Sequence, residues 1–327
     1  MFVETPFDVP ETPRPVGEAA APEAFGDLVR GGSGAFSDNT ERALRSDLAI
    51  FAAWCAACGR RALPAGPETI AAFVDAMAEA RAPATVRRYV TSISIAHRIA
   101  GCADAAKSES VRLALKRMDR SKGRRQDQAT GLTWPLRNRL LDAAGAHLID
   151  DRNRALLAVA YDTLLRRSEL SALQVTDLLE EIDGDATLLV RRSKTDQEGE
   201  GETVWVAPDS LALVRTWLSR AAIAGGFLFR SVAKGGKAGG ALPPGQVARI
   251  FKAMARAAGL PFDVVDALSG HSTRVGATQD MIGAGIELPA ILLAGRWKST
   301  AMVSRYGARL QARRNGAARL ARLQGRA

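Results

Sequence analysis

A histidine and an arginine stand three residues apart near the end of the chain, at His271 and Arg274. Residues at this spacing lie on one face of a helix, so the imidazole and the guanidinium can address one small target. The pair suits a phosphate, because arginine can donate two hydrogen bonds at once and histidine can donate one or shuttle a proton. The spacing therefore predicts an anion site; the alternative is a core histidine beside a surface arginine.

A tyrosine follows in the same part of the sequence. Tyr306 stands nine residues after Trp297, in a segment that has no acidic residue. A tyrosine hydroxyl is almost fully protonated at neutral pH and is then a poor nucleophile. Neighbouring cations favour the phenolate, so a tyrosine placed among arginines is a candidate nucleophile.

These residues lie in motifs that resemble a known family. The string Ser-Gly-His-Ser-Thr-Arg-Val-Gly-Ala at 269–277, the Gly-Arg-Trp at 295–297 and the tyrosine beyond them resemble the tyrosine recombinases, the phage integrase family. The Leu-Leu-Arg-x-x-Glu-Leu pattern at 164–170 resembles the first arginine motif of that family. The resemblance covers roughly residues 36–327 and fills six catalytic positions in order: Arg166, Lys194, His271, Arg274, Trp297 and Tyr306.

The resemblance implies the role of each position. Tyr306 would attack a DNA phosphodiester, leaving a 3′-phosphotyrosyl bond and a free 5′-hydroxyl, with no metal and no cofactor. Arg166 and Arg274 would hold the non-bridging oxygens. The phosphate would be positioned by His271, a candidate base, and by Trp297. By the same resemblance, Glu169 would support the site.

Two of these assignments have a rival from the residues themselves. Arg167 follows Arg166 directly; the motif spacing favours Arg166, and Arg167 would then be exposed or contact the DNA backbone. An ion pair between Arg166 and Glu169 is also expected at this spacing. Lys194 follows a predicted strand, and the family has a lysine on this hairpin that protonates the leaving oxygen, whereas a loop lysine is usually just solvated.

Composition agrees with a nucleic-acid partner. The chain has 327 residues, enough for about two domains, and 47% hydrophobic residues, enough for ordinary cores. The net charge is +10, and residues 1–36 carry six acids and two bases, so residues 37–327 carry +14. A basic protein of this kind binds a polyanion, most often nucleic acid, rather than being basic for solubility alone.

The same composition indicates where the protein works. No apolar run reaches about 18 residues, and the first residues lack a basic region followed by an apolar core. Three cysteines do not form a disulfide framework. We therefore expect no membrane span, no secretion signal and a reducing cytoplasm, with the protein associated with the nucleoid.

Four segments are expected along the chain. Residues 1–35, acidic and rich in proline, predict a disordered tail. Residues 36–120 have the pattern of a helical bundle, with Ser37 capping a first helix that ends near Gly59. A second helix starts at Pro67 and has an apolar face through Met77, a third is opened by Pro83 and runs from residue 85 towards residue 99, and a fourth covers about 105–118. Residues 121–131 predict a basic linker that crosses the DNA backbone, and residues 132–327 a second domain.

Several basic and polar residues are candidates for binding DNA. Thr85, Arg87 and Arg88 stand near the start of the third helix, where a helix that enters the major groove contacts bases; the alternative is a solvated basic face. The stretch 112–125 holds seven basic residues against one acid. The candidates there are Arg120, Lys122 and Arg124.

The second domain is predicted to be mostly helical. An apolar helix over 155–165 is capped by Asp150 or Asp151, and the only convincing strands cover 186–192 and 202–206. Helices follow over 210–222 and from Pro244 or Gly245. In the family, an arginine at the start of that last helix reads a guanine; here the candidates are Gln246 and Arg249, which indicates a different target. In the family a terminal helix docks into a neighbouring subunit, which the resemblance implies for the C-terminal segment here; the alternative is a frayed basic tail on DNA.

The fold that the resemblance implies is mainly α with a small β-sheet: a two-domain DNA clamp with a helical core-binding domain and an α+β tyrosine-recombinase catalytic domain. The predicted function is site-specific recombination of double-stranded DNA at inverted-repeat sites through a Holliday junction. The enzyme would be a homotetramer on two paired sites and a monomer or weakly associated off DNA. The alternatives are a non-catalytic DNA-binding or nucleoid protein of the same fold, and a topoisomerase-like enzyme that cuts one strand without exchange.

Overall fold

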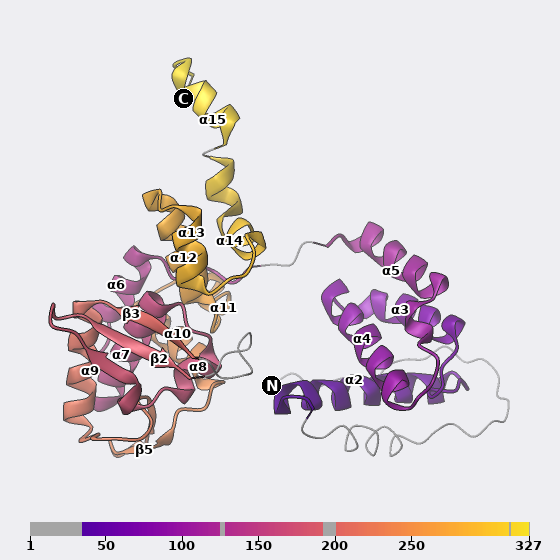
Figure 1. Ribbon diagram of the computed structural model, residues 1–327, viewed down its shortest axis with the longest axis horizontal. Helices are drawn as coiled ribbons and strands as arrows, with labels where there is room; N and C mark the ends of the chain where they lie inside the picture. The colour runs from indigo at the N-terminus through magenta and orange to yellow at the C-terminus, as the bar shows by residue number, and fades with distance from the viewer. Residues whose placement is uncertain (1–34, 125–127, 192–200, 314, 327) are drawn as a thin grey trace. The chain divides into compact units, whose positions relative to one another are not determined.

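The computed structural model describes residues 35–124, 128–191, 201–313 and 315–326 of the chain. It divides into two compact units, between residues 127 and 128, and Figure 1 shows both. Residues 1–34 of the predicted tail lie outside the described residues. In the part of the chain that is described, no helix has the length and apolar character needed to cross a membrane.

The N-terminal unit is helical, as predicted. Its elements are α2 (Asp38–Ala57), α3 (Pro67–Ala80), α4 (Pro83–Ile99), the short 3-10 helix η1 (Ala105–Lys107) and α5 (Glu109–Lys122). The expected fourth helix is split at Ser108, which is extended between η1 and α5. α5 also runs beyond residue 118 to Lys122, into the segment predicted to be linker, and ends at Gly123, whose positive φ of 74° breaks the helix.

Local sequence explains where these helices begin. The Ser37 side chain accepts a hydrogen bond from the backbone N–H of Thr40 and caps α2. α3 and α4 begin with prolines, whose missing N–H costs nothing in a first turn. The apolar faces of the helices in this unit form one core. In it the rings of Phe51 on α2 and Phe73 on α3 meet edge to face, with their centroids 4.9 Å apart.

In the second unit, helices surround a small β-sheet. Its helices before the C-terminal third are α6 (Trp134–Asp142), α7 (Leu148–Thr163), α8 (Arg167–Ala172), the 3-10 helix η2 (Val175–Asp177), α9 (Pro208–Arg220) and α10 (Gln246–Ala257). The rest are α11 (Phe262–Asp266), α12 (Ser272–Ala284), α13 (Leu288–Gly295), α14 (Ala301–Ala312) and α15 (Gly316–Leu323).

The sheet is larger than predicted. β1 (Leu178–Glu180), β2 (Ala186–Val190) and β3 (Glu202–Val206) form an antiparallel sheet in that order. A second antiparallel pair, β4 (Arg230–Val232) and β5 (Ala238–Ala241), lies between α9 and α10, where no strand was predicted. The prediction that 186–192 and 202–206 were the only strands was therefore wrong, because three- and four-residue strands depend on a partner more than on their own propensity.

The cap of α7 also differs from the prediction. His147, not Asp150 or Asp151, is the N-cap residue, and Asp150 in the first turn accepts a hydrogen bond from the His147 backbone N–H at 3.1 Å. The helix ends at Thr163, two residues earlier than expected, because Leu164 adopts a left-handed conformation with φ 50°. This turn directs the chain away from the helix just before Arg166.

Two hydrophobic clusters hold this unit together. The larger cluster joins α7, α9, α10 and the inner face of the β1–β2–β3 sheet, with Trp217 fully buried at its centre. The smaller one joins α12, α13 and α14 through Ile282, Ile291 and Val303, with Trp297 packed against it. The second cluster holds the C-terminal helices against α12, so it fixes the positions of the residues that follow α13.

Candidate active site

Arg166 lies at the junction between α7 and α8. Its Nη1 donates to Glu169 Oε1 at 2.7 Å, and its backbone N–H donates to Glu169 Oε2 at 2.8 Å. The predicted ion pair between the two residues is therefore present. Glu169 is buried, whereas the Arg166 side chain keeps about a fifth of its surface exposed. Arg167, the rival residue, is exposed.

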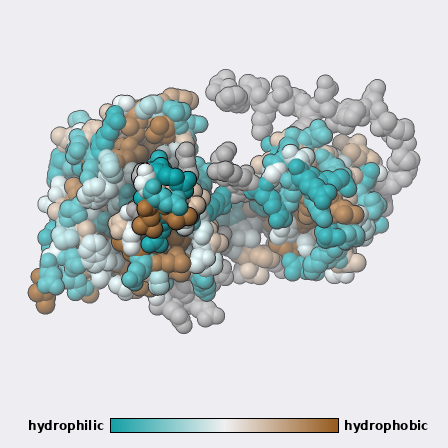
Figure 2. Space-filling view, turned by 90° about the horizontal axis from the view of Figure 1, so that it is seen from above, coloured by the Kyte–Doolittle hydropathy of each residue, from teal (hydrophilic) through white to brown (hydrophobic). Residues whose placement is uncertain are grey.

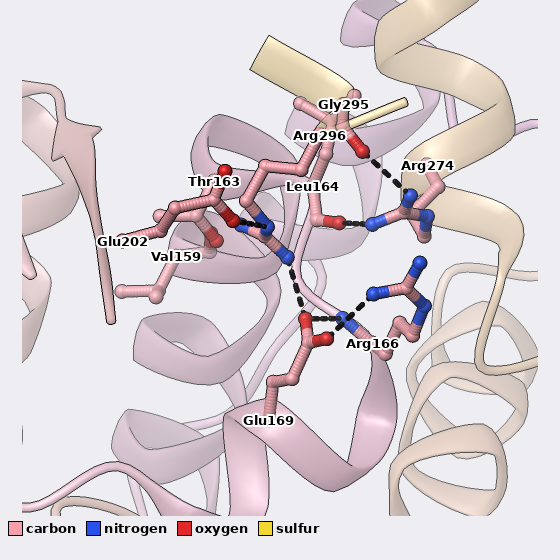
Figure 3. Close-up of polar contacts among 9 residues, drawn as sticks. All are labelled: Val159, Thr163, Leu164, Arg166, Glu169, Glu202, Arg274, Gly295 and Arg296. Atoms are coloured by element: carbon pink, nitrogen blue, oxygen red, sulfur yellow. Dashed lines mark hydrogen bonds and ion pairs between the residues drawn. The ribbon is translucent and has the colours of Figure 1, made fainter. Parts of the chain in front are cut away.

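Arg274 is buried in α12, and two backbone carbonyls orient it (Figure 3). Its Nη1 donates to the oxygen of Leu164 and its Nη2 to the oxygen of Gly295, the latter at 2.9 Å. Burial, together with the positive charges of Arg166 and Arg296, lowers the pKa of Arg274 to about 10. The group still carries its charge at neutral pH, and no carboxylate bonds to it directly among the described residues.

Trp297 lies between Arg274 and Tyr306. The guanidinium carbon of Arg274 is 5.0 Å from the centre of the indole, and the ring of Tyr306 meets the indole edge to face at 5.8 Å. Gly295 makes this possible, because a Cβ there would lie 2.0 Å from an atom of the Trp297 ring. The structure thus brings Tyr306, Trp297 and Arg274 together.

The backbone around Tyr306 is held against α12. Gln279 of that helix donates from Nε2 to the Tyr306 carbonyl oxygen at 3.2 Å. Gly307 follows, and a Cβ there would lie 2.3 Å from Ile282 Cδ1, so α14 approaches α12 closely at this point and a larger residue would displace the Ile282 side chain. α14 is therefore held against α12 at Tyr306 and at the residue that follows it.

His271 is the N-cap residue of α12, one turn before Arg274. Partial burial of the ring is the main cause that lowers the pKa of His271, and the positive charges of Arg274, Arg167 and Arg166 lower it further. The residue keeps an exposed edge. It is therefore mostly neutral at pH 7 and can accept a proton.

Arg296 is a member of the site that the sequence did not single out. It is 8% exposed, and its Nη2 donates to Glu169 Oε2 at 2.5 Å (Figure 3). Its Nε lies 3.2 Å from Glu202 Oε2, at the start of β3. The one sequence signal for it was its place in the Gly-Arg-Trp motif, directly after the apolar helix α13.

Lys194 lies outside the described residues. The strands on either side of its segment are described: β2 ends at Val190, which pairs with Glu202 at the start of β3. The segment that carries Lys194 is therefore bounded by two strand ends, one of which provides the carboxylate beside Arg296.

The candidate DNA-binding residues on α4 are held by carboxylates. Arg88 makes two hydrogen bonds to the fully buried Asp47, at 3.0 and 2.8 Å. Arg87 pairs with Asp119 of α5. Thr85 is partly exposed in the first turn of the helix.

The remaining candidates lie on α5, just after it, and on α10. Arg120 is exposed. Lys122 donates from Nζ to the backbone carbonyl oxygen of Glu79 at 2.9 Å, and Arg124 pairs with the carboxylate of Asp119 at 2.8 Å. The side of the N-terminal unit where α5 lies is largely hydrophilic (Figure 2). In the other unit, Gln246 begins α10 and Arg249 is exposed one turn later.

Taken together, the site is a cluster of cations beside a tyrosine, on a mainly helical fold. The sequence profile of the phage integrase family matches residues 137–313. The chain is 30% identical to the Cre recombinase of Escherichia phage P1, over 83% of this chain and 84% of the phage protein. It is 31% identical to an integrase/recombinase, a XerD homologue of Selenomonas ruminantium, over 83% and 81% of the two chains.

Solved structures share the fold. XerH recombinase bound to a difH substrate superposes with a TM-score of 0.67 at 17% identity, over 92% of this chain and 84% of that one. A λ integrase tetramer bound to a Holliday junction gives a TM-score of 0.60 at 18% identity, over 87% and 76%. The fold is thus that of a DNA recombinase. The chain belongs to the phage integrase family, the tyrosine recombinases, and its class of activity is site-specific DNA recombination.

Proposed function

We propose that this protein cleaves and rejoins DNA strands through a covalent bond between Tyr306 and a 3′-phosphate. The observation that carries the proposal is the convergence of Tyr306, Trp297 and Arg274, from α14, the loop after α13 and α12, beside Arg166. A tyrosine oxygen next to charged guanidinium groups is suited to attack a phosphodiester.

The two arginines stabilise the charge that develops on the phosphate. Arg274 is oriented by carbonyl oxygens, which leave its positive charge uncancelled. Arg166 is fixed by Glu169 and remains partly exposed, so it can reach an oxygen of a bound phosphate. Donors that are already oriented need no rearrangement during the reaction, which is why such groups lower the barrier.

The proton balance uses two further residues. The Tyr306 oxygen forms a bond to phosphorus as the bond from phosphorus to the 5′-oxygen breaks. His271, mostly neutral at pH 7, accepts the phenol proton, and Lys194 supplies a proton to the leaving 5′-oxygen. Attack by a 5′-hydroxyl on the phosphotyrosyl bond reverses the sequence, so the reaction needs no oxidant and no nucleotide.

The same comparison supports a proposal for the substrate and the assembly. We propose that the segment 36–120 is a core-binding domain, 121–131 a linker on the DNA backbone and 132–327 the catalytic domain. They would clamp an inverted-repeat site in nucleoid DNA, and a homotetramer would join two sites. The λ integrase tetramer on a Holliday junction supports this, as do Leu320 and Leu323 of α15, which are 51% and 86% exposed and suit a neighbouring subunit.

The experiment is covalent trapping on a nicked suicide substrate that carries the protein's own site. Such a site can be located by footprinting on DNA that flanks the gene. The wild-type protein should give an SDS-resistant adduct. Tyr306→Phe should bind the same DNA with an unchanged Kd and give no adduct, because the attacking oxygen is gone.

The chain offers a matched control, since Tyr89 and Tyr161 are its only other tyrosines. Tyr161 donates to Asp280 at 2.6 Å, and Tyr161→Phe should still form the adduct. An adduct that survives in Tyr306→Phe would refute the assignment. A wild-type protein that only shifts DNA in a salt-sensitive way would instead be a binding protein.

A further inference from the structure

Arg296 has a backbone conformation that an arginine rarely adopts. It ends α13 with φ 52° and ψ 50°, in the left-handed region. Helices commonly end in this conformation, and glycine is the usual residue there because it has no Cβ to strain. An arginine in this position therefore needs a reason other than ending the helix.

The side chain supplies that reason. It is turned into the protein, where its Nη2 bonds to Glu169 and its Nε lies beside Glu202 (Figure 3). Removing a guanidinium from water is costly unless it is paired, and here two carboxylates from different elements pair with it. Arg296 thus joins α8 to β3 at the point where the chain leaves α13 for Trp297 and α14.

The contact changes the charge available to Arg166. Glu169 would otherwise face Arg166 alone, and a carboxylate held by one guanidinium largely cancels its charge. In the structure, Oε1 accepts from Arg166 and Oε2 from Arg296, so one negative charge is shared between two positive ones. Arg166 therefore keeps a larger share of its positive field for an anion.

The second carboxylate extends the contact to the hairpin. Glu202 pairs with Val190 across β2 and β3, at the end where the chain passes from β2 to β3. Its ion pair with Arg296 links that end to Glu169. One side chain therefore positions two parts of the site that are far apart in the sequence.

We infer that Arg296 is a positioning residue of this recombinase: it binds Glu169 and Glu202, and so leaves more of the positive field of Arg166 available to the phosphate and keeps that side chain aligned. This inference rests on the proposed function, and it adds a residue to the machinery that acts through Glu169 without touching DNA.

The test measures single-turnover adduct formation on the suicide substrate, with DNA affinity measured separately. Arg296→Met should slow the adduct by about 10–100-fold, the size seen when a partner that orients a functional side chain is removed, with Kd changed by less than about threefold. Arg296→Gly should slow it equally, although glycine suits the backbone better. Arg296→Lys, which keeps the charge, should form the adduct at a rate between those of the wild type and Arg296→Met.

A double-mutant cycle gives the decisive result. If Arg296 acts through Glu169, then Arg296→Met should have less than about a threefold effect in a Glu169→Gln background. The matched control is Arg137→Met, which removes another buried arginine that pairs with a carboxylate, Asp209 at 3.1 Å. It should lower the melting temperature and leave the adduct rate of the folded fraction unchanged.

Three outcomes would overturn the inference while the wild-type protein still forms its adduct. They are a wild-type rate for Arg296→Met, a wild-type rate for Arg296→Gly, and an undiminished effect of Arg296→Met in the Glu169→Gln background. The glycine variant decides the matter if the methionine variant does not fold. A wild-type protein that forms no adduct refutes the proposed function itself, and the inference with it.

Discussion

Arg274 of the second unit and Arg87 and Arg88 of α4 in the N-terminal unit are held by different acceptors. In the second unit, Arg274 is buried and bonded to two backbone carbonyls. In the N-terminal unit, Arg88 makes both of its bonds to the carboxylate of Asp47, and Arg87 pairs with Asp119. One arrangement orients a cation and leaves its charge intact; the other orients a cation and cancels it.

The difference matches two kinds of task. A site that must stabilise new negative charge in a transition state needs cations that are fixed and uncancelled beforehand. A surface that meets the DNA backbone can exchange one anion for another, because a phosphate can replace a carboxylate when the complex forms. The arginines of the N-terminal unit would then bind more weakly than their number suggests.

The largest effect is expected at Arg274. Arg274→Met should lower the rate of adduct formation by about 10²–10³-fold, because it removes an oriented donor from the developing charge. The measurement is single-turnover trapping on the suicide substrate at saturating protein.

The control for that prediction is a second buried arginine. The pKa of Arg152 is also lowered to about 10, by burial, and its Nη1 donates to a backbone carbonyl, that of Arg230, at 2.9 Å. Arg152→Met should cost stability and leave the adduct rate of the folded protein unchanged. Equal loss in both variants would mean that burial of the charge, and not its place, matters.

A smaller effect of opposite sign is expected at Asp119. This carboxylate pairs with both Arg87 and Arg124. Asp119→Asn should release two cations, tighten DNA binding by a few-fold, about 2–5-fold, and steepen the dependence of log K on log salt by about one to two. Fluorescence anisotropy over a salt series measures both quantities.

Asp75→Asn is the matched control, because it releases one exposed arginine, Arg117, from a 2.6 Å pair in the same unit. It should change affinity less than Asp119→Asn. Tighter binding of the same size in both variants would show a general effect of charge, and weaker binding in Asp119→Asn would show that Asp119 positions Arg87 instead of cancelling it.

The smallest effect is expected in how the stability of the protein depends on pH. The pKa of His271 is lowered in the folded protein, so between that value and the unfolded one, about 6.5, the unfolded chain binds more protons. His271 therefore costs no stability above about pH 6.5, and the free energy of unfolding decreases as the pH falls through this window. Melting temperatures of the wild-type protein and His271→Gln between about pH 7.5 and 5 should diverge in slope, with the wild type falling faster. Parallel curves would contradict a lowered pKa for His271 in the folded protein.

Much of the fold could be predicted because its signals are local. The starts of α3 and α4 at Pro67 and Pro83, and the cap of α2 at Ser37, depend on residues within one turn. The strands β1 and β5 could not be found this way, since each is only a few residues long and exists through pairing with a neighbour. The left-handed turn at Leu164, which ends α7 early, likewise had no sequence signal.

The sequence by itself determined the spacing of His271, Arg274, Trp297 and Tyr306 and the basic character of the chain, because both are read directly along it. Only the tertiary structure decided which groups hold the side chains of the site, Arg274 and Arg296 among them. Leu164 is 110 positions from the arginine that it orients, and Glu169 is 127 positions from Arg296. Contacts of that range depend on how the helices pack, and no local pattern encodes them.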